Sequence, residues 1–355
     1  MLDIGKLVQQ IRLNCNISDA KYWGHYSICG LLMRYRELFR GEHSLAPWEK
    51  IPTAEISSWI DKREAAWKDL ENEDLRQLII NDVAYDPFDS EAITHQLKSS
   101  GLIYGSGYGM FGKPAFFLAR LVSSKEIYDY NIYYVGSELC RDLSAHPAML
   151  QGRCIYLRLD SLRNVVWERL QELNPTHYTP VLDEIASHYD IPKGSGFMDG
   201  LVPKMDDVLR DVSELFLMHE VGEAFEDDFS DEWLEILNVG CDRHGELYVR
   251  ATKDLLADTS VMGPLRMIVK QKNRVLLAFY MAFLHGIRKE LFPEIKTAFE
   301  QFLMSGDWDL IERARNAGYA KANRLKEAII SLWKEQQGAE NFKAALKSYI
   351  TARTS

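Results

Sequence analysis

The residues with the clearest capacity for chemistry are His219-Glu220-Val221-Gly222-Glu223. An imidazole and a carboxylate at positions i and i+4 lie one above the other on a helix, close enough to bind one metal ion. Glu220 points about a quarter-turn away, and the Glu at this position is the general base in the His-Glu-x-x-His zinc helix. Because Glu223 replaces the second histidine, the expected preference moves towards manganese or iron, although zinc remains a candidate.

The remaining ligands of such a site would come from later in the chain. Asp254 and Asp258 are at i and i+4 on a predicted helix, and His244 and His285 lie on either side of them. Helical bundles can bring inward carboxylates and histidines together around metal ions. The pattern therefore predicts a metal-dependent enzyme of hydrolytic type, with Glu220 as the general base or as a group behind the ligands.

The alternative interpretation of the same residues is a polar pair within a helical core. A histidine on an apolar helix face is commonly satisfied by one hydrogen bond, and Glu223 could pair with Arg266 or Arg288. In that case we expect a non-catalytic interaction or scaffold protein. Its partner would be another protein or a second copy of this chain.

A glycine-rich segment, residues 107–113, matches the Gly-x-x-x-x-Gly-Lys spacing of a phosphate-binding loop. Pro114 stands where Ser or Thr would hold magnesium, and residues 115–122 have the composition of a strand rather than a helix. A hairpin is therefore the favoured interpretation. A nucleotide or anion site over 101–114 is the weaker alternative. Its binding groups would be Gly107, Gly109, Gly112 and Lys113.

The elements that must position these residues are predicted to be mainly helical. Apolar residues recur at steps of three and four over 19–40, Thr53 begins a second helix, and a third follows Asp89. From residue 101 to residue 135 the runs are aromatic and β-branched. These runs predict an antiparallel β-meander with a turn at Ser123–Lys125.

The domain boundary is predicted from a cluster of prolines and glycines over 174–196. We expect an N-terminal α+β domain over 1–175, a linker over 176–204, and an all-α domain over 205–355. The last domain includes one long helix over 262–290. The predicted fold class is α+β and predominantly α.

Composition limits the partners and the compartment. The chain of 355 residues has a formal net charge of −10, and acidic residues concentrate over 206–235, so nucleic acid is not expected as a partner. No secretory signal pattern is present, and no run approaches the roughly 18 apolar residues of a membrane span. The five cysteines lack a Cys-x-x-Cys pair, which indicates a reducing compartment. We therefore expect a cytoplasmic protein that does not bind membranes.

Three segments, Tyr26–Gly30, Gly107–Pro114 and Met218–Glu223, resemble a family of uncharacterised bacterial proteins. The resemblance covers most of the chain. It implies a bacterial, cytoplasmic protein, and it implies no activity, substrate or site residue.

Overall fold

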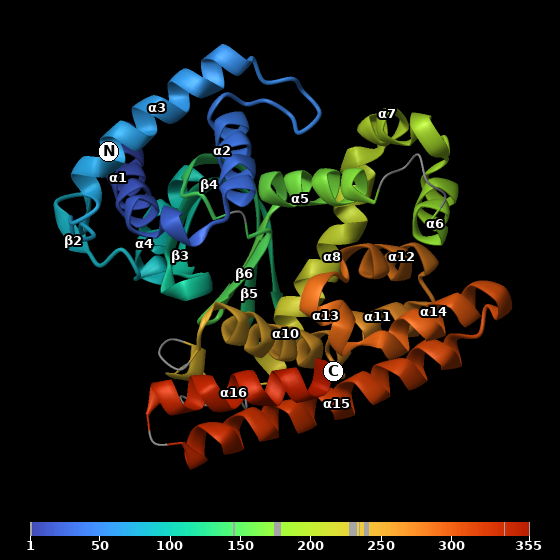
Figure 1. Cartoon of the computed structure of the whole chain (residues 1–355). Helices are drawn as coiled ribbons and strands as arrows, with labels where there is room; N and C mark the ends of the chain where they lie inside the picture. The colour runs from blue at the N-terminus through green and yellow to red at the C-terminus, as the bar shows by residue number, and fades with distance from the viewer. Residues whose placement is uncertain are drawn as a thin grey trace. The chain divides into compact units, whose positions relative to one another are not determined.

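The computed structural model describes residues 2–144, 146–173, 179–226, 233, 235–237, 241–336 and 338–354. The chain divides into two compact units, Met1–Glu168 and Arg169–Ser355, called unit 1 and unit 2 below (Figure 1). The fold is α+β and predominantly helical, as predicted.

A five-stranded sheet lies at the centre of unit 1, in the order β3-β4-β5-β7-β6. Its strands are β3 (Leu102–Tyr108), β4 (Pro114–Ile127), β5 (Tyr130–Arg141), β6 (Ala148–Gln151) and β7 (Cys154–Arg158). The antiparallel β3-β4-β5 meander confirms the prediction, whereas β5 pairs with β7 in parallel and β6 pairs with β7 antiparallel.

The predicted turn at Ser123–Lys125 is wrong. Strand β4 continues through these residues, and the chain reverses at Tyr128, which has a φ of +53°. This end of β4 is largely exposed, so polar side chains are compatible with a strand here.

The first predicted helix of unit 1 is interrupted, which the apolar periodicity does not predict. The expected single helix over 19–40 is instead two helices, α1 (Ile4–Tyr22) and α2 (Ile28–Glu42). The side chain of Ser27 caps α2 by accepting a hydrogen bond from the backbone N–H of Gly30. The apolar stripes of the two helices follow one another at helical spacing, so the periodicity does not reveal the boundary between them. The Ser27 cap marks that boundary.

Two of the other helices of unit 1 begin where the sequence predicts them. The helix at Thr53 and the helix after Asp89 are confirmed. The remaining bounds are α3 (Thr53–Leu70), β1 (Leu78–Ile80), β2 (Val83–Tyr85), α4 (Ser90–Leu97) and α5 (Leu159–Glu172), the last of which continues into unit 2.

In unit 2, the regular elements that the structure describes are helices, as predicted. They are α6 (Pro180–Tyr189), α7 (Phe197–Leu201), α8 (Met205–Phe225), α10 (Arg243–Thr259), α11 (Pro264–Gln271), α12 (Arg274–Phe283), α13 (Gly286–Leu291), α14 (Pro293–Ser305), α15 (Trp308–Glu335) and α16 (Ala339–Thr354). Helix α10 packs against α8, α13 and α15. No helix within the described ranges is long and apolar enough to cross a membrane.

Two segments of unit 2 differ from the expected outline. The segment 176–204, for which a linker was predicted, contains α6 and α7, and α6 packs against α12. The expected long helix over 262–290 is three helices. Lys272 has a φ of +52° and ends α11, and Asn273 caps α12 by accepting a hydrogen bond from the N–H of Leu276. Residues that end and cap helices therefore interrupt an apolar stripe that looked continuous.

Helices α8 and α10 approach closely at Gly222. A Cβ atom added to Gly222 would lie 2.5 Å from the carbonyl oxygen of Ala257 and 3.2 Å from Cα of Gly263. Backbone atoms cannot move aside as a flexible side chain can, so only glycine fits here. This contact sets the distance between the polar side chains of α8 and those of α10.

We expect Gly222→Ala to destabilise unit 2 by about 1–3 kcal/mol or more, because the methyl group overlaps backbone atoms. Gly41→Ala is the matched control: Gly41 also lies in a helix, and nothing lies within 4 Å of its added Cβ. Gly41→Ala should be neutral or stabilising by up to about 1 kcal/mol. Urea denaturation followed by circular dichroism measures both, and equal stability of the two variants would contradict the close contact.

Candidate metal centre

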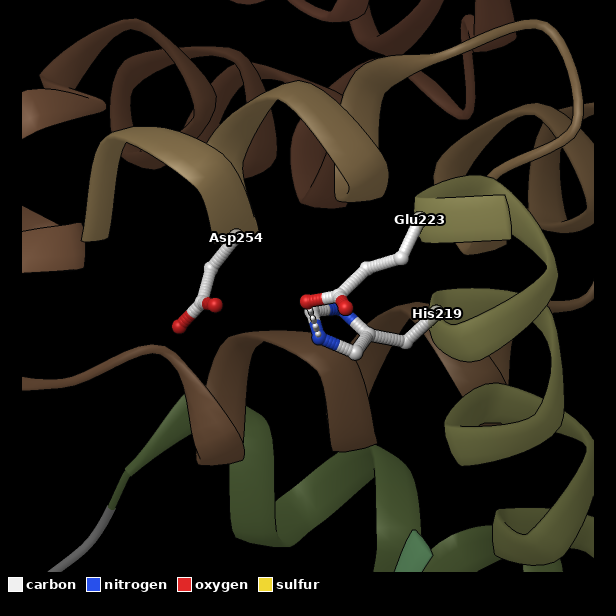
Figure 2. Close-up of side chains that lie close together, drawn as sticks. All are labelled: His219, Glu223 and Asp254. Carbon is white, nitrogen blue, oxygen red and sulfur yellow. Dashed lines mark ion pairs between the residues drawn. The ribbon is translucent and has the colours of Figure 1, made fainter. Parts of the chain in front are cut away.

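His219 and Glu223 project from α8 towards α10, where Asp254 lies opposite them (Figure 2). One donor atom from each of these three side chains lies within 4.8 Å of the other two. Within the group, Nε2 of His219 lies 3.5 Å from Oε1 of Glu223. All three residues are half-buried. We call His219, Glu223 and Asp254 the donor triad.

The orientation of the His219 ring is fixed by Asp258. Nδ1 of His219 lies 2.7 Å from Oδ1 of Asp258. Because an ionised carboxylate can only accept, Nδ1 is the donor, and Nε2 is the atom that faces Glu223. Metal-binding histidines usually donate their other ring N–H to a carboxylate in this way.

Asp258 is itself held from two further helices. It is only 3% exposed, and its Oδ2 accepts hydrogen bonds from the Tyr280 hydroxyl at 3.2 Å and from Nη1 of Arg288 at 3.4 Å. Arg288 also donates to the carbonyl oxygen of Phe283 at 3.0 Å. Both oxygens of Asp258 are therefore occupied, which makes it a positioning group for His219 rather than a member of the donor triad.

Lys253 pairs with the other oxygen of Glu223. Its Nζ lies 2.6 Å from Oε2, so Oε1 remains directed at His219. Asp254 has a weaker partner, since its Oδ2 is 3.9 Å from Nε of Arg288. Glu223 and Asp254 thus each keep an oxygen that no lysine or arginine of the described chain occupies.

The charges of the cluster shift the pKa of each member. Burial would lower the pKa of His219, but the charge and hydrogen bond of Asp258, together with Glu223, hold it well above its usual value. Burial would raise the pKa of Glu223, but the charge of Lys253 and the bond to His219 lower it to about 2. Burial raises the pKa of Asp254 despite Arg288. Without a metal ion, the cluster therefore favours the protonated form of His219.

Glu220 lies beside the donor triad without joining it. Its half-buried carboxylate makes no hydrogen bond or ion pair in the described part of the chain. Burial and the charge of Glu223 raise its pKa to about 7. Glu220 can therefore exchange a proton near neutral pH, which is what a general base requires.

The two other predicted metal ligands do not join the group. His244 lies at the start of α10, and the rise of 1.5 Å per residue separates it from Asp254 by about 15 Å. It lines a different cavity, near Lys343 and Leu346. His285 precedes α13 as an exposed residue and is not among the three grouped donors.

The glycine-rich segment forms a β-hairpin loop, the favoured alternative. Gly107 is in β3, Gly112 has a φ of +67°, and the N–H of Gly109 donates to the carbonyl oxygen of Lys113 at 2.8 Å. The segment runs into strand β4 and does not begin an α-helix, so no helix N-terminus faces a phosphate.

The Lys113 side chain points into unit 1 and not towards an anion site. It is 3% exposed, and its Nζ lies 3.0 Å from Oδ1 of Asp19 and 2.9 Å from Oδ1 of Asp142. The two carboxylates already occupy the ammonium group. The structure therefore gives no support to Lys113 as a ligand of a nucleotide.

Sequence reasoning missed Lys253 and Tyr280, and it gave Arg288 a different partner. Lys253 precedes Asp254 directly, but adjacent helical residues point about 100° apart, so nothing in the spacing links Lys253 to Glu223. Arg288 was considered as a partner of Glu223, whereas it contacts Asp258 and Asp254. These contacts depend on how α8, α10 and α13 pack.

The fold and the site together define a protein with an α+β unit followed by an all-helical unit that carries a half-buried cluster of acidic groups. The chain belongs to the family of unknown function DUF6866. The model of the family's N-terminal domain matches residues 6–158, and the model of its C-terminal domain matches residues 163–353. Comparison with curated proteins and with solved structures finds no match.

We expect Asp258→Asn to lower the pKa of His219, because the substitution removes the nearest negative charge. Histidine NMR titration of the protein in chelator measures this pKa directly. His95 is the internal control, since it is exposed and lies on α4 in the other unit. An unchanged His219 titration would contradict the contact with Asp258.

Proposed function

We propose that unit 2 binds one divalent metal ion, zinc, manganese or iron, at His219, Glu223 and Asp254, and that the bound ion supports a hydrolytic reaction. The observation that carries this proposal is the donor triad, with its three donor atoms within 4.8 Å of one another and Nε2 of His219 directed into the group. An imidazole with two carboxylates is a ligand set that suits these ions.

The charge balance of the cluster supports a divalent ion. With Glu220 ionised, four carboxylates, Glu220, Glu223, Asp254 and Asp258, stand against two cations, Lys253 and Arg288, with His219 neutral as a metal ligand requires. The difference is a charge of −2, which one divalent ion cancels. Partly buried charges of one sign are costly unless such compensation is present.

The geometry requires only a small movement for binding. With bonds of about 2.0–2.2 Å to nitrogen or oxygen, neighbouring ligand atoms lie roughly 3–4 Å apart. The pair Nε2 of His219 and Oε1 of Glu223 is already at 3.5 Å, while Lys253 stays on Oε2. The donor atom of Asp254 lies within 4.8 Å of the other two, so a shift of about 1 Å would bring it to the same range.

Glu220 would be the general base of the reaction. A divalent ion lowers the pKa of a bound water towards about 7, and a neighbouring carboxylate can accept the proton that this water loses. Glu220 has a pKa of about 7 and no hydrogen-bond partner in the described chain, so its carboxylate is available for this role.

Metal binding is the first expected outcome. Protein purified without chelator, then titrated by calorimetry with zinc or manganese, should bind one ion, and affinity should rise with pH because the ion displaces a proton from Nε2 of His219. His219→Ala and Glu223→Ala should each weaken binding by about 100-fold or more, and Asp258→Asn by about 10–100-fold. His244→Ala should leave binding unchanged.

A protein that neither contains nor takes up any of the three ions would exclude this proposal. Binding that His244→Ala weakens as much as His219→Ala would place the ion at another site.

Loss of the general base is the second expected outcome. Glu220→Gln should keep metal affinity within about threefold and should lower hydrolysis of activated esters or phosphodiesters by about 100-fold or more. The bound ion lowers the pKa of Glu220 below its metal-free value of about 7, so the rate of the unsubstituted protein should fall only where more acidic conditions protonate Glu220, and Glu220→Gln should lack that fall. Unchanged activity with the same pH profile would remove Glu220 from the mechanism.

The second candidate is a non-catalytic interaction protein with a structural polar cluster. Two observations favour it: Lys253 already pairs with Glu223, and Arg288 already pairs with Asp258. The metal titration separates the candidates, because a cluster that serves packing alone should not bind an ion.

A further inference from the structure

A second polar site lies entirely within unit 1. A cavity of about 170 Å³ is enclosed by residues of α1, α2, the end of β5 and the start of α5. Several polar groups of its wall can donate hydrogen bonds that no acceptor in the described part of the chain receives. The cavity shares no residue with the donor triad of unit 2.

Ser161 and Asn164 are the first two such groups. Ser161 is 1% exposed, and its Oγ has no hydrogen-bond partner among the described residues. The side chain of Asn164, one turn further along α5, makes no hydrogen bond in the described part either. A buried hydroxyl without a partner costs free energy, so its position in a cavity wall suggests a partner that binds there.

Two arginines add positive charge to the same wall. Arg141 is 6% exposed; its Nε pairs with Glu138 at 3.1 Å and its Nη1 donates to the carbonyl oxygen of Asp142 at 3.1 Å. No hydrogen bond involves its Nη2 within the described ranges. Arg12 is exposed, and its one hydrogen bond is a long one of 3.4 Å to the carbonyl oxygen of Leu139. Both guanidinium groups can therefore still donate to a ligand.

The acidic residues of the wall are all paired with arginine. Glu42 pairs with Arg63, Glu138 with both Arg141 and Arg158, and Asp160 with Arg163. The wall itself carries Arg12 and Arg141 against these three carboxylates, and arginines outside the wall, Arg63, Arg158 and Arg163, neutralise the carboxylates. Arg12 has no carboxylate partner among the described residues, so its charge can meet the charge of a ligand.

We propose that this cavity binds a small organic monocarboxylate. The guanidinium groups of Arg12 and Arg141 can only donate and hold carboxylates well, and Ser161 and Asn164 can donate to the same ligand. Leu38 and Leu139 provide an apolar part of the wall for the hydrocarbon of the ligand. The three wall carboxylates would repel a dianion. The volume equals that of about five or six liquid waters, which limits the ligand to a few carbon atoms or one ring.

The test uses the full chain in chelator, so that no ion in unit 2 can bind the probe. Butyrate and benzoate are titrated by ligand-observed NMR, beside butyramide, benzamide and inorganic phosphate. Both carboxylates should bind with millimolar affinity or better, and the amides and phosphate should bind more weakly by about tenfold.

Two variants locate the binding in this cavity. Arg12→Gln removes an exposed charge, and Asn164→Leu removes a donor and fills space. Each should weaken carboxylate binding by about tenfold. Arg120→Gln is the matched control, an exposed arginine of the same unit outside the wall, and should change nothing. Circular dichroism and thermal unfolding check each fold, and Arg12→Gln decides alone if Asn164→Leu is unfolded.

Three results would overturn the proposal. They are no carboxylate binding to the unsubstituted protein, binding that the amides or phosphate equal, and carboxylate binding that Arg12→Gln leaves unchanged. None of these bears on the metal proposal, because the donor triad is titrated separately.

Discussion

The backbone contact of α8 with α10 at Gly222 is the constraint on which the polar cluster of unit 2 depends. An added Cβ would lie 2.5 Å from the carbonyl oxygen of Ala257, so no other residue allows this approach. His219 lies one turn before Gly222, and Asp258 directly follows Ala257. The 2.7 Å contact between His219 and Asp258 is therefore a direct consequence of how closely the two helices pass.

Unit 1 provides a useful comparison, because it also buries charged groups. There Lys113 lies within 3.0 Å of both Asp19 and Asp142, and all three are at most 3% exposed. The carboxylates accept further hydrogen bonds from the backbone N–H groups of Leu143 and Phe116. Such a closed, fully buried network joins α1 to the sheet.

The cluster of unit 2 differs from that network in exposure. Its side chains are partly exposed, at 19% for His219 and 13% for Glu223. The donor atoms of this cluster are therefore within reach of an ion from solution, whereas those of the Lys113 network are not. That accessibility is the physical reason for proposing that the cluster of unit 2 binds an ion.

The sequence by itself determined the features that arise within one helix or strand. The helical period placed His219 and Glu223 on one face of α8, and composition located the β3-β4-β5 meander, because both depend on neighbours a few residues apart. Tertiary structure alone decided that Asp258 orients His219, that Lys253 holds Glu223, and that His244 lies about 15 Å along α10 from Asp254. These contacts depend on how helices far apart in the chain pack against one another, which residue spacing does not encode.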